Sequence, residues 1–323
     1  MSLKKIVAQI RRNRNFLVTA HVNLEGDAIG AQLAFYWLVK KLGKNAVMVD
    51  EDSMPYGYDF LPGIEKIIRY KDNLKNVSFD CFVVLDCSDL KRTGEVWRLN
   101  KNNKPVINID HHISNDHFGT YNWVVPHASS ACELVYRLYK TMKVPLDPQS
   151  ALCLYTGMVC DTGSFRYTNT GWQTHRIASD LLKYGVNPAQ VYKNVFGNYP
   201  LKDMQLISKI QNNIQANAKG NLIWFEVKKD WLKKYKTIYA DLSDQVLSFG
   251  RQVKGAEVVA LFKENLGLKS EVRVNFRSQG KVDVNEIAKS FGGGGHRTAA
   301  GCTIAGRLDD IKKKVLRKIE EKL

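Results

Sequence analysis

The chain has 323 residues, of which 44% are hydrophobic and 25% are charged, so it is long enough for two ordinary globular domains. No apolar run approaches the ~18–20 residues that a membrane-spanning helix needs, and we therefore expect no membrane partner. The net charge of +16 favours a polyanionic ligand such as a nucleotide or a nucleic acid, although a basic face turned to water would produce the same excess.

The six cysteines lack the C-x-x-C spacing of zinc and redox sites, and most lie in apolar runs. They predict buried thiols in a reducing compartment. The N-terminal stretch is basic but has no signal-peptide core followed by a cleavage site. Together these features predict a cytoplasmic protein.

Short apolar strands alternate with helices through the first half of the chain. We expect strands at 16–22, 45–50, 79–89 and 104–112, and helices at 28–43, 129–142 and 148–160. The helix at 28–43 is predicted to be amphipathic and to end at Gly43. Because the strands are nearly continuous in apolar residues, they are typical of buried parallel strands. The alternation predicts a doubly wound α/β domain with a mostly parallel sheet over residues 1–185.

The pattern changes in the second half. Residues 186–220 are helical and polar, and we expect them to form a linker. Beyond it, strands are predicted at 221–227, 256–264 and 268–278, followed by a helix at 282–291, a glycine run and a basic helix at 311–323. This order predicts a smaller α+β domain over residues 221–323.

Acidic and histidine residues gather where the apolar segments of the first domain end. They are His21, Glu25 and Asp27, then Asp86 and Asp89, then Asp110, His111 and His112, and finally Asp161. Ligands of open α/β sheets bind at the carboxyl ends of the strands. Four such clusters in one crevice would repel one another without a cation. Oxygen and imidazole ligands suit Mn²⁺ or Mg²⁺, and a pair of such ions is a common device for attack at phosphorus.

The glycine-rich stretch "FGGGGHRTAAG" at 291–301 is a second candidate for ligand binding. Consecutive glycines let backbone N–H groups approach a phosphate or a base closely. Arg277, at the end of a predicted strand, carries a planar group that suits two phosphate oxygens. Arg92, after the second acidic cluster, is either a phosphate contact or an exposed helix-face arginine.

Five segments in order, "HVNLEGDAIGA", "VVLDCSD", "NIDHH", "GMVCDTGSF" and "FGGGGHRTAAG", resemble the DHH phosphoesterase superfamily. The likeness is greatest to the branch with a C-terminal DHH-associated domain that carries GGGH, which contains nanoRNA-degrading oligoribonucleases and pAp phosphatases. It covers nearly the whole chain. It implies a metal-dependent phosphohydrolase that acts on short oligoribonucleotides, pAp, or linear or cyclic di-AMP, with two manganese ions or, alternatively, magnesium.

The resemblance also implies roles for matching positions. One metal would be held by His21, Glu25 and Asp86, and the other by Asp27, Asp86, His111 and Asp161. His112 would face the scissile phosphate, and Asp110 would orient His111 as a carboxylate behind a ligand commonly does. The substrate would be gripped by Arg277, Gly293, Gly294 and His296 of the second domain, with Arg92 as a further contact.

One departure from the family pattern bears on activity. Related sequences usually read H-x-N-P-D-G-D, whereas this chain has Leu24 and Glu25 at the proline and first aspartate positions. A nucleotide-binding regulator with a weakened metal site is therefore an alternative to the enzyme. A single-strand exonuclease of the RecJ kind is another, and it is disfavoured because we recognise no OB-like domain after the glycine motif. Relatives often dimerise, so a homodimer is also open.

Overall fold

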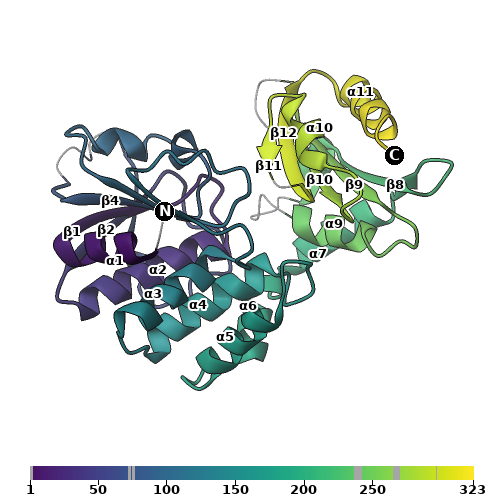
Figure 1. Ribbon diagram of the computed structural model, residues 1–323. Helices are drawn as coiled ribbons and strands as arrows, with labels where there is room; N and C mark the ends of the chain where they lie inside the picture. The colour runs from purple at the N-terminus through teal and green to yellow at the C-terminus, as the bar shows by residue number, and fades with distance from the viewer. Residues whose placement is uncertain (1–2, 72–73, 75–76, 236–241, 265–269, 296) are drawn as a thin grey trace. The chain divides into compact units, whose positions relative to one another are not determined.

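The structure is a computed structural model that describes residues 3–71, 74, 77–235, 242–264, 270–295 and 297–323 (Figure 1). The chain forms two compact units, Met1–Asn198 and Tyr199–Leu323. The predicted linker at 186–220 spans this division. It contains helix α6 (Pro188–Phe196), which belongs to the first unit, and helix α7 (Leu201–Gln211), which belongs to the second.

The first unit is built on a six-stranded sheet in the order β3-β2-β1-β4-β5-β6, with every neighbouring pair parallel. The strands are β1 (Asn15–Thr19), β2 (Asn45–Asp50), β3 (Ile67–Arg69), β4 (Cys81–Leu85), β5 (Val106–Asp110) and β6 (Tyr121–Val124). In this doubly wound order the direction of winding reverses between β1 and β4. The predicted α/β class is confirmed, and the sheet gains two short edge strands, β3 and β6, that were not predicted.

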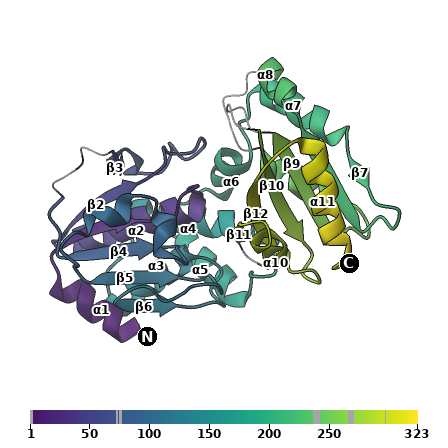
Figure 2. The same cartoon turned by 90° about the horizontal axis from the view of Figure 1, so that it is seen from above.

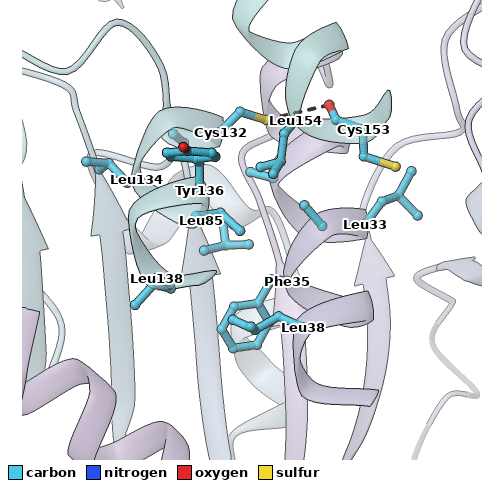
Figure 3. Packing of buried hydrophobic residues seen from close by; sticks show 14 of the residues in the cluster. Leu33, Phe35, Leu38, Leu85, Cys132, Leu134, Tyr136, Leu138, Cys153 and Leu154 are labelled. Carbon is cyan, nitrogen blue, oxygen red and sulfur yellow. Dashed lines mark hydrogen bonds between the residues drawn. The ribbon is translucent and has the colours of Figure 1, made fainter. Parts of the chain in front are cut away.

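Helices cover one face of this sheet and enclose the larger core (Figures 1 and 2). They are α1 (Leu3–Arg12), α2 (Gly26–Lys41), α3 (Ala131–Met142) and α4 (Pro148–Asp161), with α5 (Trp172–Leu182) packed on α3 and α4. Figure 3 shows Phe35 and Leu38 of α2 in this core with Leu85 of β4. The opposite face packs on a smaller cluster that includes the 3-10 helices η2 (Leu90–Thr93) and η3 (Val96–Leu99).

Helix α2 corrects the prediction of an amphipathic helix. All of its first ten residues are buried. The reason is that α2 contacts strands β2 and β4 as well as helices α3 and α4, so it has no face left for water in this part. Its polar residues there, Asp27 and Gln32, are therefore buried and need partners inside the protein.

Helices α2 and α4 approach each other closely because glycines line their contact. A Cβ atom on Gly157 would lie 2.2 Å from Cys132 Sγ and 2.8 Å from Asp27 Oδ1, and one on Gly30 would lie 2.5 Å from the carbonyl oxygen of Cys153. Any side chain at these positions would push the helices apart. The close spacing of α2 and α4 thus depends on having glycine, which has no side chain, at these two positions.

The second unit is a six-stranded sheet in the order β11-β12-β10-β9-β8-β7, in which only β8 and β9 pair in parallel. The strands are β7 (Gln215–Ala216), β8 (Leu222–Val227), β9 (Val258–Glu264), β10 (Glu271–Ser278), β11 (Gly294–Gly295) and β12 (Ala299–Ala305). Helices α10 (Val284–Lys289) and α11 (Leu308–Glu320) share one core with the sheet, while α7 and α9 (Ser243–Gly250) share another. Helix α8 (Lys229–Tyr235) follows β8. The smaller α+β unit agrees with the prediction.

Among the described helices, none is both long and apolar enough to cross a membrane.

Candidate metal centre

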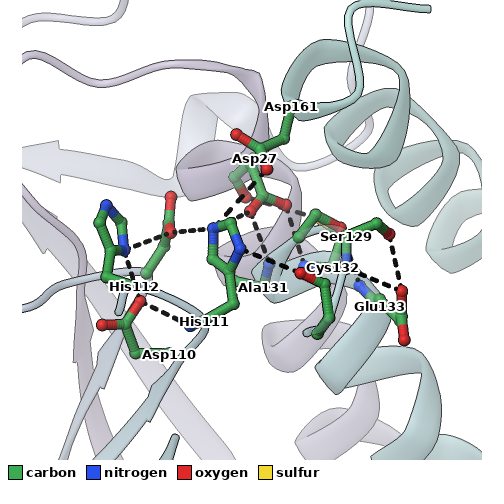
Figure 4. Close-up of polar contacts among 12 residues, drawn as sticks. Asp27, Asp110, His111, His112, Ser129, Ala131, Cys132, Glu133 and Asp161 are labelled. Carbon is green, nitrogen blue, oxygen red and sulfur yellow. Dashed lines mark hydrogen bonds and ion pairs between the residues drawn. The ribbon is translucent and has the colours of Figure 1, made fainter. Parts of the chain in front are cut away.

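The candidate site lies at the carboxyl ends of β1, β4 and β5, beside the point where the sheet winding reverses. His21 follows β1, Asp86 follows β4 and Asp110 ends β5. All three side chains are buried. Helices α2 and α4 add Asp27 and Asp161 (Figure 4). The structure thus brings the predicted carboxylates and histidines together from four parts of the chain.

Asp86 lies at the centre of this group. Its Oδ2 atom is 3.4 Å from His21 Nε2, and its Oδ1 atom is 3.4 Å from His111 Nε2 and 3.5 Å from His112 Nδ1. The backbone of Asp86 is left-handed, with φ +53°, which only a few residue types besides glycine tolerate. The turn ends β4 sharply and directs the carboxylate toward three imidazoles.

Asp27 is held by the N-terminus of α3. Its two carboxylate oxygens accept hydrogen bonds from the backbone N–H groups of Ala131 (2.6 Å) and Cys132 (2.9 Å). A helix N-terminus stabilises a negative charge through its unpaired N–H groups and its dipole. The same carboxylate lies 3.9 Å from His111 Nε2. Asp27 is therefore fixed as an anion whose oxygens point at the imidazole.

His111 links three carboxylates. Its Nε2 atom lies 3.7 Å from Asp161 Oδ2, in addition to its contacts with Asp86 and Asp27, and its Nδ1 atom is 3.3 Å from the carbonyl oxygen of Ala128. A carbonyl behind Nδ1 fixes the ring so that Nε2 faces the carboxylates. Asp161 in turn accepts a hydrogen bond from Asn169, a residue that the sequence did not single out.

Asp110 holds the His112 ring, whereas the family resemblance implies that it orients His111. Its Oδ1 atom is 2.6 Å from His112 Nδ1 and accepts a hydrogen bond from the His111 backbone N–H at 2.8 Å. Side chains two residues apart on an extended chain point the same way, and adjacent ones point apart. Asn115 donates to the other carboxylate oxygen, at 2.6 Å. Asp110 therefore orients the histidine predicted to face phosphate.

Glu25 stands apart from this buried group. Its side chain is 57% exposed, and its Oε1 atom lies 4.0 Å from His21 Nε2. It is the residue before the first turn of α2. Leu24, in the position where relatives have proline, is buried in the main core, so packing anchors this turn without the proline ring.

The shifts in pKa show how strongly these groups act on one another. Burial alone would raise the pKa of Asp86, but its contacts with His111 and His21 hold it well below the ordinary value. Burial would lower the pKa of His21, yet Asp86 raises it to about 9, against the charge of Arg92. Burial, together with the charge of Asp86, raises the pKa of Asp27 to about 6. The carboxylates thus require positive charge close by.

A pair of divalent ions fits this arrangement. Three sets have ligand atoms close enough to share an ion: His21, Glu25 and Asp86; Asp27, His111 and Asp161; and Asp86, Asp110, His111 and His112. The first set is the one that the family resemblance implies for one metal, and the second contains three of the four ligands implied for the other. The fourth, Asp86, belongs to the first set, and its Oδ1 atom lies 3.4 Å from His111 Nε2 of the second. This Oδ1 atom is buried and faces two imidazole nitrogens, at 3.4 Å and 3.5 Å, without a well-formed hydrogen bond to either. A buried carboxylate oxygen held this loosely is a position where a cation would be stabilising.

The predicted phosphate contacts differ from one another in their surroundings. Arg92 lies on η2, next to the site, and its charge acts on His21. Arg277 is the penultimate residue of β10 and pairs with the exposed carboxylate of Asp244. A Cβ on Gly293 would lie 2.2 Å from the carbonyl oxygen of Gly301, so close packing on β12 explains this glycine, whereas a Cβ on Gly294 would meet Asn285 Oδ1 at an ordinary contact distance of 3.9 Å. His296 lies outside the described residues.

Asp50 is a buried acid that the sequence analysis missed. It ends β2, and its Oδ1 atom accepts hydrogen bonds from the Thr19 hydroxyl and the Ala20 N–H, both at 3.1 Å. Its Oδ2 atom accepts from Gln32 of α2 at 2.9 Å. Asp50 thereby ties the end of β1, next to His21, to the helix that carries Asp27. Its place as the last residue of an apolar strand was the available signal.

Buried carboxylates and imidazoles at the switch point of a parallel sheet are the arrangement of an α/β enzyme that works with divalent metal ions. Comparison with known proteins makes this specific. Residues 15–158 match the N-terminal domain of the DHH family, and residues 232–321 match the DHHA1 domain. The chain belongs to the DHH family, and it is a hydrolase of the phosphoesterase type.

Two relatives are named "Bifunctional oligoribonuclease and PAP phosphatase NrnA". The one from Thermus thermophilus is 31% identical over 312 residues, which cover 95% of this chain and 89% of the relative. The one from Bacillus subtilis is 28% identical and covers 93% and 92%. A solved structure of an exopolyphosphatase-related protein from Bacteroides fragilis is 26% identical, with a TM-score of 0.90 over 99% of this chain and 95% of that one.

Proposed function

We propose that this protein hydrolyses phosphoester bonds in short oligoribonucleotides and in pAp, with water activated by two divalent metal ions. The observation that carries the proposal is a pair of ligand sets at the switch point of the sheet, which the buried carboxylate of Asp86 joins through its contact with His111. When bound there, the ions would activate water and stabilise the charge that develops on the phosphoryl oxygens.

The roles of the protein residues follow from their contacts. His21, Glu25 and Asp86 would hold one ion, and Asp27, Asp86, His111 and Asp161 the other. Asp110 fixes the His112 ring through Nδ1, which leaves Nε2 as the ring atom directed at a phosphate oxygen. Arg92 adds positive charge at the same edge. No nucleophilic side chain is required, because water is the attacking group.

The ligand chemistry supports manganese as the working metal. Each set combines carboxylate oxygens with one imidazole, and thiolates take no part in either set. Oxygen ligands alone would suit magnesium, whereas an imidazole in each set favours manganese. Magnesium is the alternative ion.

The names of the relatives support the substrates. Proteins that align with more than nine tenths of this chain are named as oligoribonucleases and PAP phosphatases, and a net charge of +16 suits an anionic substrate. We include linear and cyclic di-AMP as further candidate substrates because they present the same adenylate and phosphate groups. A cytoplasmic location, consistent with the six free cysteines, and a homodimer are also part of this proposal.

The test is a substrate panel with controlled metal. The purified chain, stripped with a chelator, is assayed on pApA, a five-residue RNA, pAp and cyclic di-AMP with Mn²⁺, Mg²⁺ or no added ion at fixed salt. We expect turnover of the short RNA and of pAp with Mn²⁺, less with Mg²⁺ and none without metal. Metal-independent turnover, or binding without turnover under every condition, would contradict the proposal.

A further inference from the structure

A cavity of about 590 Å³ opens on the second unit, between the end of α10 and the outer face of α11. Helix α11 contributes Lys313, Lys314, Arg317 and Lys318, together with the carboxylates of Asp310 and Glu321, while Ser290 and Phe291 contribute from the turn after α10. Its size lies within the ~300–1,000 Å³ of ordinary ligand pockets. The cavity thus combines a charged helix face with an aromatic ring from another segment.

Positive charge exceeds negative charge in this cavity, with four cations against two carboxylates. Glu321 is shared between Arg317 (3.7 Å) and Lys318 (3.0 Å). Within the part of the chain that the structure describes, neither Lys313 nor Lys314 forms an ion pair, and both are exposed. Two cations therefore remain for an anion from outside the protein.

The aromatic ring gives the cavity a second kind of contact. Phe291 is half-buried and packs on the core beneath α11, and the Lys314 ammonium lies 5.6 Å from its ring centre. Phe291 lies in the short segment between helix α10 and strand β11, and these two elements fix its position. A nucleotide whose base stacks on the Phe291 ring would place its phosphate beside the two lysines.

We infer that this cavity binds single-stranded RNA, outside the metal centre. A positive groove with an aromatic platform is the usual way in which proteins hold single strands without reading their sequence. Lys313 and Lys314 each have a second cation one helical turn away, Arg317 and Lys318, each of which is shared with Glu321, so α11 presents two adjacent lysines to neighbouring phosphates in a region of positive charge. The inference rests on the proposed function for the choice of RNA as the polyanion, and it assigns a role to the basic C-terminal helix.

Fluorescence anisotropy tests the inference. The full chain is titrated into a labelled oligoadenylate of about twelve nucleotides, with chelator present. In the Lys313→Gln, Lys314→Gln double variant we expect roughly tenfold weaker binding at about 0.1 M salt. The slope of log affinity against log salt should fall in magnitude by about 1.4, since each lost phosphate contact on a single strand removes ~0.7. The loss should be confined to the long RNA. Hydrolysis of pApA by the same variant should stay at the wild-type rate.

The matched control is Lys233→Gln, Lys234→Gln, another adjacent pair of exposed lysines, on α8. It removes the same charge and should leave the affinity and the salt slope unchanged. Unchanged binding in the α11 variant would overturn the inference, as would an equal loss in the α8 control or an equal loss of pApA hydrolysis. Binding is read without metal, so a failure of the proposed hydrolysis would be seen separately.

Discussion

In the first unit the charged groups of the candidate site are buried and most are held by a second group, whereas in the second unit the predicted substrate contacts lie near the surface. Asp27 rests on the N-terminus of α3 and Asp110 on Asn115. Arg277, by contrast, pairs with an exposed carboxylate, and Gly294 is exposed. Buried anions fixed by hydrogen bonds form a rigid site, while exposed groups can adjust to a ligand.

The difference separates two tasks. Metal ions need ligands fixed to within fractions of an ångström, and the switch point of a parallel sheet supplies such positions. Nucleotides of several kinds need contacts that tolerate variation. We therefore expect substitutions in the first unit to abolish or detune metal-dependent chemistry, and substitutions in the second to alter substrate capture.

The largest effect is expected from Asp86→Asn, because this residue belongs to one ligand set and contacts His111 of the other. The amide keeps the shape but removes the charge, and turnover of pApA at saturating Mn²⁺ should fall by about a thousandfold or more. Bound manganese, measured by calorimetry, should fall with it. Activity within tenfold of the wild type would show that the two sets do not share this carboxylate.

Arg277→Ala tests the second unit. Loss of a charge-assisted hydrogen bond to phosphate, worth roughly 1.5–3 kcal/mol, should lower kcat/KM by about ten- to a hundredfold. The effect should appear in KM, with manganese affinity unchanged. The pairing of Arg277 with the exposed Asp244 contributes little to stability, so the variant should fold normally. A loss of manganese would place Arg277 in the metal centre and erase the contrast between the units.

Glu25→Asp probes the one exposed ligand of the buried site. The shorter side chain would move the carboxylate away from His21, which already lies 4.0 Å from it. We expect turnover to fall roughly tenfold, as errors in ligand placement commonly do, and more manganese to be needed for half-saturation. A rise in activity would favour the regulator with a detuned site. No change in either quantity would remove Glu25 from the ligand set.

The smallest effect is expected from Asp50→Asn, and it depends on pH. Burial raises the pKa of Asp50 to about 6, against its hydrogen bond from Gln32. When a carboxyl has a higher pKa in the folded protein than in the unfolded chain, the protein loses stability as the pH rises from the unfolded pKa to the folded one. Here this window runs from about 4 to about 6. The stability of the wild type relative to Asp50→Asn should therefore fall by up to about 3 kcal/mol across that window.

Urea unfolding of both proteins at several pH values between 4 and 7 measures this difference, and other titrating groups cancel in it. The amide is accommodated if Gln32 turns over, since its Oε1 atom has no partner within the described residues. Parallel stability curves would show that Asp50 keeps an ordinary pKa in the folded protein.

Much of the fold was predictable because its strands are apolar and bounded by turns. The strands at β1, β2, β4 and β5 were predicted, and their carboxyl ends correctly located the cluster of acids and histidines. The edge strands β3 and β6 have three or four residues, too few for a recognisable pattern. The burial of the first ten residues of α2 depends on contacts with two later helices, which local periodicity cannot reveal.

The pairing of side chains within the site was harder to predict. The carboxylate of Asp110 contacts the His112 ring because alternate residues share a side of the chain, and that rule could have been applied. The anchor of Asp27 at the N-terminus of α3 joins residues more than a hundred positions apart, and nothing local in the sequence indicates it. Family likeness supplied the ligand sets, but the supporting contacts came only from the structure.

The close contact of α2 with α4 has a consequence for biosynthesis. The ligands are spread from His21 to Asp161, and Asp161 ends the helix that packs on α2 through Gly30 and Gly157. A growing chain that has not yet extended beyond α4 lacks the last carboxylate of the second set, even with the central strands in place. Since domains usually fold as units during translation, tight metal uptake should mark the completed first unit, and ribosome-bound fragments ending before residue 161 should remain without it.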